Sequence, residues 1–196
     1  MKQGVSAHIA VFLGRFQPPT IAHAATVQYI LTQWHKIIIG IVYHSPPPDN
    51  FDYKKWGYTL KESSFDVARN PFTPEEVHEM WKGYINSCNA GNRISCQLTK
   101  RPHFTQQFNA IYPPDTTDIV CIQAPEGDPD YGRQYTIFQK MFNRNVYFID
   151  PPLPLHNKDI KRIIKLYHRS WQEYIPVGAY EVFMQINGPI RVSLCD

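Results

Sequence analysis

Short apolar runs alternate along the chain with segments whose apolar residues recur at helical spacing. Residues 9–13 and 36–43 are continuous, β-branched runs, typical of strands buried on both faces of a parallel sheet. The segment between them predicts a helix, because its apolar residues recur on one helical face: Val27, Ile30, Leu31 and Trp34. A strand, a helix and a strand at this spacing form a right-handed βαβ unit, whose loops lie at the sheet edge.

The alternation continues beyond the first unit. Further runs predict strands at 94–98, 118–122 and 146–149. A short helix or turn at 104–112 and a helix at 131–142 lie between them, and a helical pattern begins at residue 157. The pattern therefore predicts a doubly wound α/β fold, with a mostly parallel five-stranded sheet and a helical C-terminal part. We expect a single domain over 1–196, with its core at about 8–150 and the C-terminal part at about 151–196.

Local chemistry places the start of one helix. Thr73 suits the N-cap, Pro74 the first helical position, and Glu76 the third, where it completes a capping box. The helix that follows has a regular apolar face, made of Val77, Met80, Trp81 and Tyr84. Before it, residues 44–60 form a long loop rich in proline and aromatic residues. We interpret this loop either as a lid over a site or as an insertion whose aromatic side chains pack on the body.

Charge and composition narrow the class of partner. The 196 residues include 20 Lys and Arg against 17 Asp and Glu, a net charge of +3. This excess suits an anionic small molecule and is too small to indicate nucleic acid. No apolar run reaches membrane-spanning length, and the N-terminus has no signal-peptide pattern. The four cysteines form no C-x-x-C pair, so we expect reduced, mostly buried thiols in a cytoplasmic protein.

Candidate chemistry gathers where the first strand meets the first helix, at residues 14–23. Helix N-termini offer backbone N–H groups and a favourable dipole to anions. Gly14 can turn with positive φ or let a ligand approach the backbone closely, and Arg15 can donate two hydrogen bonds to phosphate oxygens. His23 falls in the first helical turn, where a bound phosphate would rest. These residues predict a phosphate-binding junction.

The same segment resembles a known family. Gly14-Arg15-Phe16-Gln17-Pro18, followed five residues later by His23, is similar to the first signature of the nucleotidylyltransferases with an HxGH-type motif, in the form found in archaeal-type nicotinamide-mononucleotide (NMN) adenylyltransferases. Thr20 and Ala22 stand where that motif has its first histidine and its glycine. The resemblance implies a Rossmann-like fold, with catalytic roles for His23, Arg15 and Thr20, and nucleotide or phosphate binding by Gly14, Phe16 and Gln17. A helix N-cap would equally account for Thr20.

Two later segments extend the resemblance. Arg69, just before Asn70-Pro71-Phe72-Thr73, falls on an arginine that holds nucleotide phosphates in that family. Residues 157–165 stand at the second signature, a helix start whose hydroxyl groups and arginine bind the triphosphate. Here the Ser and Thr are gone, and Lys161 or Arg162 takes the place of the arginine. The resemblance thus adds Arg69 and this basic pair to the phosphate-binding residues.

The loop 123–128 departs from the family, because it lacks the usual Ser-Gly-Asn that shapes the pyridine-nucleotide side of the site. Near the C-terminus the similarity resumes. Residues 171–176 are similar to a W-x-x-x-V-P segment, and 186–188 to the I-N-G that ends the last helix. We therefore expect Pro176 in a first helical turn and Gly188 as a C-cap.

The resemblance implies nucleotidyl transfer, in which a mononucleotide phosphate attacks the α-phosphorus of ATP and pyrophosphate leaves. The expected partners are ATP and a mononucleotide such as NMN, with Mg²⁺ carried mainly on phosphate oxygens, and neither nucleic acid nor a membrane. Two alternatives stay open: a non-catalytic nucleotide-binding or regulatory protein, and adenylyl or cytidylyl transfer to another phosphorylated acceptor. The oligomeric state, a homo-oligomer included, is also open. The retained Arg15, His23 and Arg69 favour an adenylyltransferase of NAD biosynthesis.

Overall fold

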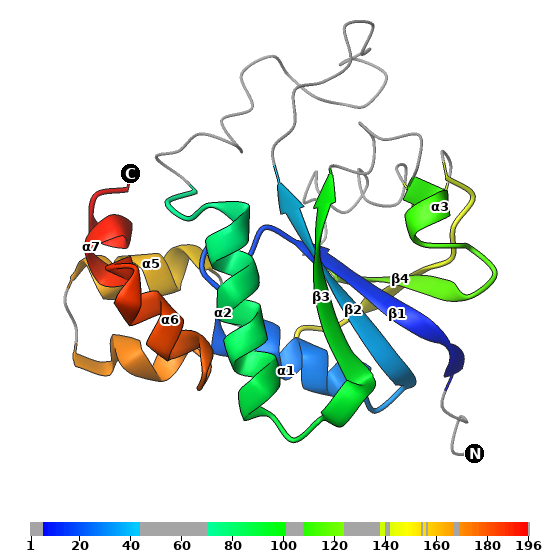
Figure 1. The fold of residues 1–196 in the computed structure, drawn as a ribbon, viewed down its shortest axis with the longest axis horizontal. Coiled ribbons are helices and arrows are strands. Elements are labelled where there is room, and N and C mark those ends of the chain that lie inside the picture. Colours follow the sequence, from blue (N-terminus) through cyan, green and yellow to red (C-terminus); the bar gives the residue numbers. More distant parts are fainter. Residues whose placement is uncertain are drawn as a thin grey trace, which may run out of the picture.

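In a computed structural model the chain forms a five-stranded sheet with helices (Figure 1). The structure describes residues 6–43, 70–100, 108–123, 138–139, 142–153, 155, 157–166 and 169–195. The strands are β1 Ser6–Gly14, β2 Trp34–Tyr43, β3 Ile94–Lys100, β4 Thr117–Ile122 and β5 Val146–Ile149. Their order is β3-β2-β1-β4-β5, and every pairing is parallel. The predicted strands and the doubly wound α/β class are confirmed.

Helices lie against the sheet on either side. They are α1 Ile21–Ile30, α2 Pro74–Ser87, α3 Phe108–Ile111, α5 Asn157–Lys165, α6 Ala179–Gln185 and α7 Gly188–Ser193, with 3₁₀ turns η2 Gly91–Arg93 and η5 Arg169–Tyr174. One core joins Ala10 and Phe12 of β1 to α1, α2 and the C-terminal helices. A second core, on Val11 of the same strand, includes Phe108 of α3 and Phe138. Successive β1 side chains therefore enter different cores, as a sheet buried on both faces requires.

The predicted start of α2 is confirmed in detail. The Thr73 hydroxyl accepts the Glu76 backbone N–H at 3.2 Å, and the Glu76 carboxylate accepts the Thr73 N–H at 2.8 Å. Pro74 occupies the first helical position. The predicted apolar face is buried: Val77, Met80, Trp81 and Tyr84. This helix start brings the segment before it, from Asn70 onward, to the carboxyl edge of the sheet (Figure 1).

Three expectations about where helices begin and end were wrong. Pro176 does not lie in a first helical turn, because α6 begins at Ala179, with Gly178 as its N-cap. Trp34 begins β2 and does not continue α1, because its indole N–H donates to the buried carboxylate of Asp118 on β4 at 2.8 Å. Gly188 is not a C-cap but the first residue of α7, and Asn187 takes the left-handed conformation instead, at φ 56°. A Cβ at residue 188 would lie 2.5 Å from the Phe183 ring, so close packing against that ring requires glycine here.

Several expectations fall partly or wholly outside the described residues, namely the loop 44–60, the loop 123–128 except for Gln123, the first part of 104–112 and most of the helix 131–142. The cysteines are all described and all unpaired. Cys121 and Cys195 are buried and the other two partly so; burial raises the pKa of Cys121 to about 12 and that of Cys96 to about 11. Across the described part of the chain, no helix is both long and apolar enough to span a bilayer.

Candidate active site

The candidate site lies at the carboxyl edge of the sheet, between β1 and β4. From β1 the chain proceeds outward through β2 to β3 on one side, and β4 and β5 lie on the other. Phe12 pairs with Val120, so the strand ends Gly14 and Ile122 reach the same level. The loops that follow them therefore open next to one another. Open α/β sheets bind ligands at such a change of strand direction.

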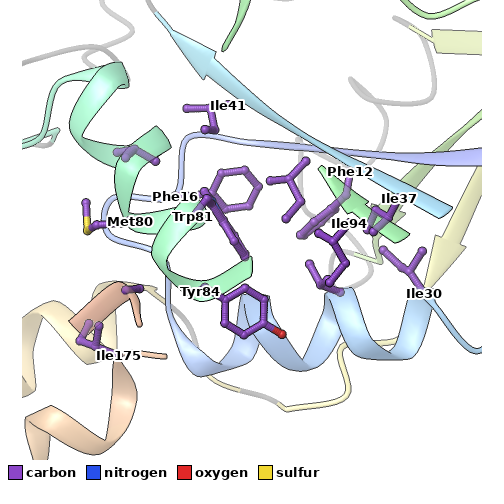
Figure 2. Packing of buried hydrophobic residues seen from close by; sticks show 14 of the residues in the cluster. Phe12, Phe16, Ile30, Ile37, Ile41, Met80, Trp81, Tyr84, Ile94 and Ile175 are labelled. Atoms are coloured by element: carbon purple, nitrogen blue, oxygen red, sulfur yellow. The ribbon is translucent and has the colours of Figure 1, made fainter. Parts of the chain in front are cut away.

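Gly14 and Phe16 share one local arrangement, and it differs from the expected glycine turn. Phe16, not Gly14, has positive φ, at 50°. Its ring folds back over Gly14, where an added Cβ would lie 2.6 Å from the ring. The ring is 4% exposed and packs edge-on against Phe12, His23 and Trp81, as part of the core shown in Figure 2. The Phe16 side chain thus faces protein, which leaves only its backbone to serve a ligand.

His23 is held from two sides at the start of α1. Its Nδ1 accepts the Thr20 backbone N–H at 3.1 Å and lies 2.9 Å from the Thr20 hydroxyl oxygen. The Phe16 ring stands perpendicular to the imidazole, with the ring centres 5.1 Å apart. Because Nδ1 is an acceptor, the neutral ring carries its proton on Nε2. Within the described part of the chain, Nε2 has no hydrogen-bond partner.

Burial lowers the pKa of His23 from 6.5 to about 4. The charged ring is disfavoured because it would lose solvent, and protonation at Nδ1 would also oppose the Thr20 N–H. At neutral pH the ring is therefore an uncharged donor through Nε2–H. Thr20 itself is 1% exposed and is the N-cap of α1, so its position serves the helix start and the histidine together.

Arg15 and Gln17 join this loop to the segment before α2. The Gln17 amide binds the Phe72 backbone twice, donating to its carbonyl at 2.9 Å and accepting its N–H at 3.0 Å. Gln17 is 8% exposed, and its side chain is used within the protein. Arg15 is exposed, and its guanidinium donates to the Asn70 side chain at 3.3 Å. The loop residues 14–23 and the segment 70–73 therefore form one structural unit.

The other predicted phosphate-binding residues are less directly placed. Arg69 lies outside the described residues, although Asn70, which follows it, contacts Arg15. Lys161 is partly buried and Arg162 is exposed, both on α5, which begins at Asn157 itself. The same helix reaches the core that contains Phe16 through its buried residue Ile160.

Sequence reasoning missed two polar residues near the site, Asn70 and Arg191. Asn70 stood inside the segment matched to the family, and only the fold reveals that Arg15 contacts it. Arg191 binds the segment after Asn70 from α7, 115 residues away from Glu76 in the sequence. No local pattern could have indicated that contact. In the described ranges, no three His, Cys, Asp or Glu side chains gather closely enough to hold a metal.

Comparison with known proteins bears on this geometry. No protein-family model matches the chain. It is 25% identical over 195 residues to the nicotinamide-nucleotide adenylyltransferase of Archaeoglobus fulgidus, covering 93% of this chain and 94% of that one. The enzyme of the same name from Pyrococcus furiosus is 24% identical over 202 residues, covering 99% and 89%. The chain resembles the archaeal nicotinamide-nucleotide adenylyltransferases. The likeness extends along nearly the full length of both chains.

Solved structures show the same fold in nucleotide-binding enzymes. A bifunctional NMN adenylyltransferase/ADP-ribose pyrophosphatase from Francisella tularensis, complexed with AMP and a manganese ion, superposes with a TM-score of 0.62 at 15% identity. The likeness covers 95% of this chain and 51% of that chain, about half of the bifunctional protein. The nicotinic acid mononucleotide adenylyltransferase of Plasmodium falciparum, complexed with NaAD, gives 0.54 at 13% identity, covering 94% and 98%.

Proposed function

We propose that the protein is an adenylyltransferase that transfers AMP from Mg-ATP to nicotinamide mononucleotide, giving NAD and pyrophosphate. The observation that carries this proposal is the neutral His23 at the start of α1, with Nδ1 bound to Thr20 and the proton on Nε2. The archaeal relatives, matched over most of their length, carry the name of this activity. The unpaired, largely buried cysteines suit an enzyme of the cytoplasm.

The reaction needs little covalent chemistry from the protein. A phosphate oxygen of the mononucleotide forms a bond to the α-phosphorus of ATP, and the bond from that phosphorus to the bridging oxygen breaks. Pyrophosphate leaves with the bonding electrons. The attacking phosphate is already ionised, so no general base is required, and catalysis consists of positioning and charge stabilisation.

Each site residue has a definite part in this proposal. His23 donates from Nε2 to a non-bridging oxygen of the α-phosphate, where charge is redistributed during transfer. Arg15 and Arg69, with Lys161 or Arg162, hold the β- and γ-phosphates. Gly14 and Phe16 contribute backbone N–H groups, while Gln17 fixes the loop through Phe72. Thr20, which is buried, holds the His23 ring in this orientation.

Mg²⁺ enters with ATP as part of the substrate. Mg²⁺ is a hard cation that keeps several waters and binds readily to the phosphate oxygens of a nucleotide. A solved relative in fold holds AMP together with a manganese ion. We therefore assign no side chain of this protein to the metal.

The direct test is incubation with Mg-ATP and a panel of mononucleotides, with release of pyrophosphate as the readout. We expect release with NMN, and a loss of turnover of about 10²–10³ in His23→Ala. ATP affinity should stay within a few-fold, because the donor acts chiefly in the transition state. Equal turnover of the two proteins would contradict the role of His23. If the wild-type protein binds ATP but transfers AMP to none of these acceptors, it is a nucleotide-binding protein without this activity.

A further inference from the structure

Arg191, on α7, reaches across to the segment between Asn70 and α2. Its Nη1 donates to a carboxylate oxygen of Glu76 at 2.5 Å, and its Nη2 donates to the carbonyl oxygen of Pro71. The guanidinium carbon also lies 5.0 Å from the centre of the Phe72 ring. Arg191 is 31% exposed and Glu76 26%, so the contact is partly shielded from water. One side chain thus holds Pro71 and Phe72 of this segment together with Glu76 in the first turn of α2.

Glu76 links Arg191 to the helix cap. Its other carboxylate oxygen accepts the Thr73 backbone N–H at 2.8 Å. Although burial alone would raise it, the pKa of Glu76 is lowered by the hydrogen bonds from Arg191 and Thr73 and by the positive charge of Arg191. The carboxylate is therefore ionised at neutral pH, and the pair with Arg191 is a charge-assisted hydrogen bond.

The same segment is also bound by the loop after β1. Gln17 binds both backbone polar groups of Phe72, and Arg15 binds the side chain of Asn70. The segment 70–73 is therefore held both by the proposed catalytic loop and by α7. A contact that fixes residues 70–73 therefore also fixes Asn70, the partner of Arg15, and Phe72, the partner of Gln17.

We infer that Arg191 is a positioning residue for ATP binding, which acts through Pro71, Phe72 and Glu76 on the contacts that hold Arg15 and Gln17 in the loop after β1. This inference rests on the proposed function, since it assigns Arg15 to the triphosphate. Arginine is required because its planar fork serves a carboxylate and a carbonyl at once, with its face against an aromatic ring. Lysine offers one ammonium group and cannot keep all three contacts.

The test compares Arg191→Met with wild-type protein by calorimetric titration with Mg-ATP and, separately, with NMN. We expect ATP binding to weaken about tenfold, because a displaced segment no longer holds Arg15 in place, while NMN affinity changes by less than about twofold. Arg191→Lys should restore part of the ATP affinity. Lys165→Met is the matched control. Lys165 also anchors the C-terminal end, through the Cys195 carbonyl, without touching residues 70–76.

Unchanged ATP affinity in both Arg191 variants overturns the inference, as does an equal loss in Lys165→Met. If Arg191→Met does not fold, Arg191→Lys alone decides, since it keeps the charge. The titrations need no turnover, so a wild-type protein that binds ATP without releasing pyrophosphate contradicts the proposed function and leaves this inference to its own result. A wild-type protein without affinity for ATP overturns both.

Discussion

The His23 ring accepts hydrogen bonds at Nδ1, stands against Phe16, and has its pKa lowered to about 4 by burial. Between pH 6.5 and 4 the unfolded chain binds a proton at this residue that the folded chain does not. The free energy of unfolding therefore falls as the pH falls through this range. The stabilisation associated with the neutral His23 ring is fully present above pH 6.5. We expect it to amount to at most about 3 kcal/mol, because the ring is only partly enclosed.

Urea unfolding of wild-type protein and His23→Gln, at about pH 7.5 and about pH 4.5, tests this at the same residue. Glutamine at this third helical position still accepts the Thr20 N–H, as in a capping box, but does not titrate. The wild-type protein should lose more stability on acidification than the variant. An identical loss in both would show that His23 does not differ in protonation between the folded and unfolded states.

At the scale of the element, α2 depends on its N-cap. The Thr73 hydroxyl satisfies a backbone N–H of the first turn, at Glu76. Thr73→Ala should lower the free energy of unfolding by about 1 kcal/mol, and Thr73→Ser, which keeps the hydroxyl, by much less. ATP affinity should hardly change, since the Glu76 contact to the Thr73 backbone survives.

Arg69→Ala is the opposite case, with weaker ATP binding and nearly the same melting temperature. Parallel behaviour of Thr73→Ala and Arg69→Ala would refute one of these assignments.

For the whole molecule, we propose that residues 1–196 unfold as one unit. The C-terminal helices share a core with the sheet and α2, through Ile164, Phe183 and Val192. The crossing of α2 and α6 is so close that a Cβ on either Gly83 or Gly178 would overlap the other's backbone. Far-ultraviolet dichroism and tryptophan fluorescence should report one coincident transition. Gly178→Ala should shift both midpoints downward together, whereas two separated transitions would indicate independent parts.

Local sequence determined the features that depend on near neighbours. The Thr73–Glu76 capping box closes over three residues, and the β-branched runs need only a strand buried on two faces, so both could be predicted. The loop with Arg15 and His23 was likewise found from its place between a strand and a helix. Features of this kind depend only on residues close together in the sequence, so they can be predicted before the fold is known.

Tertiary structure decided whatever depends on distant partners. Trp34 reads as helical by spacing, but Asp118, 84 residues away, places its indole at the start of a strand. The sequence suggests that Gly14 is needed for a turn. In the structure a side chain at residue 14 would instead overlap the Phe16 ring, which packs against Trp81 on α2. Arg191 carried no local signal at all. These positions are set by packing and by long-range hydrogen bonds, whose partners meet only when the chain has folded. A short stretch of sequence around each residue does not include its partner, so it cannot predict the contact.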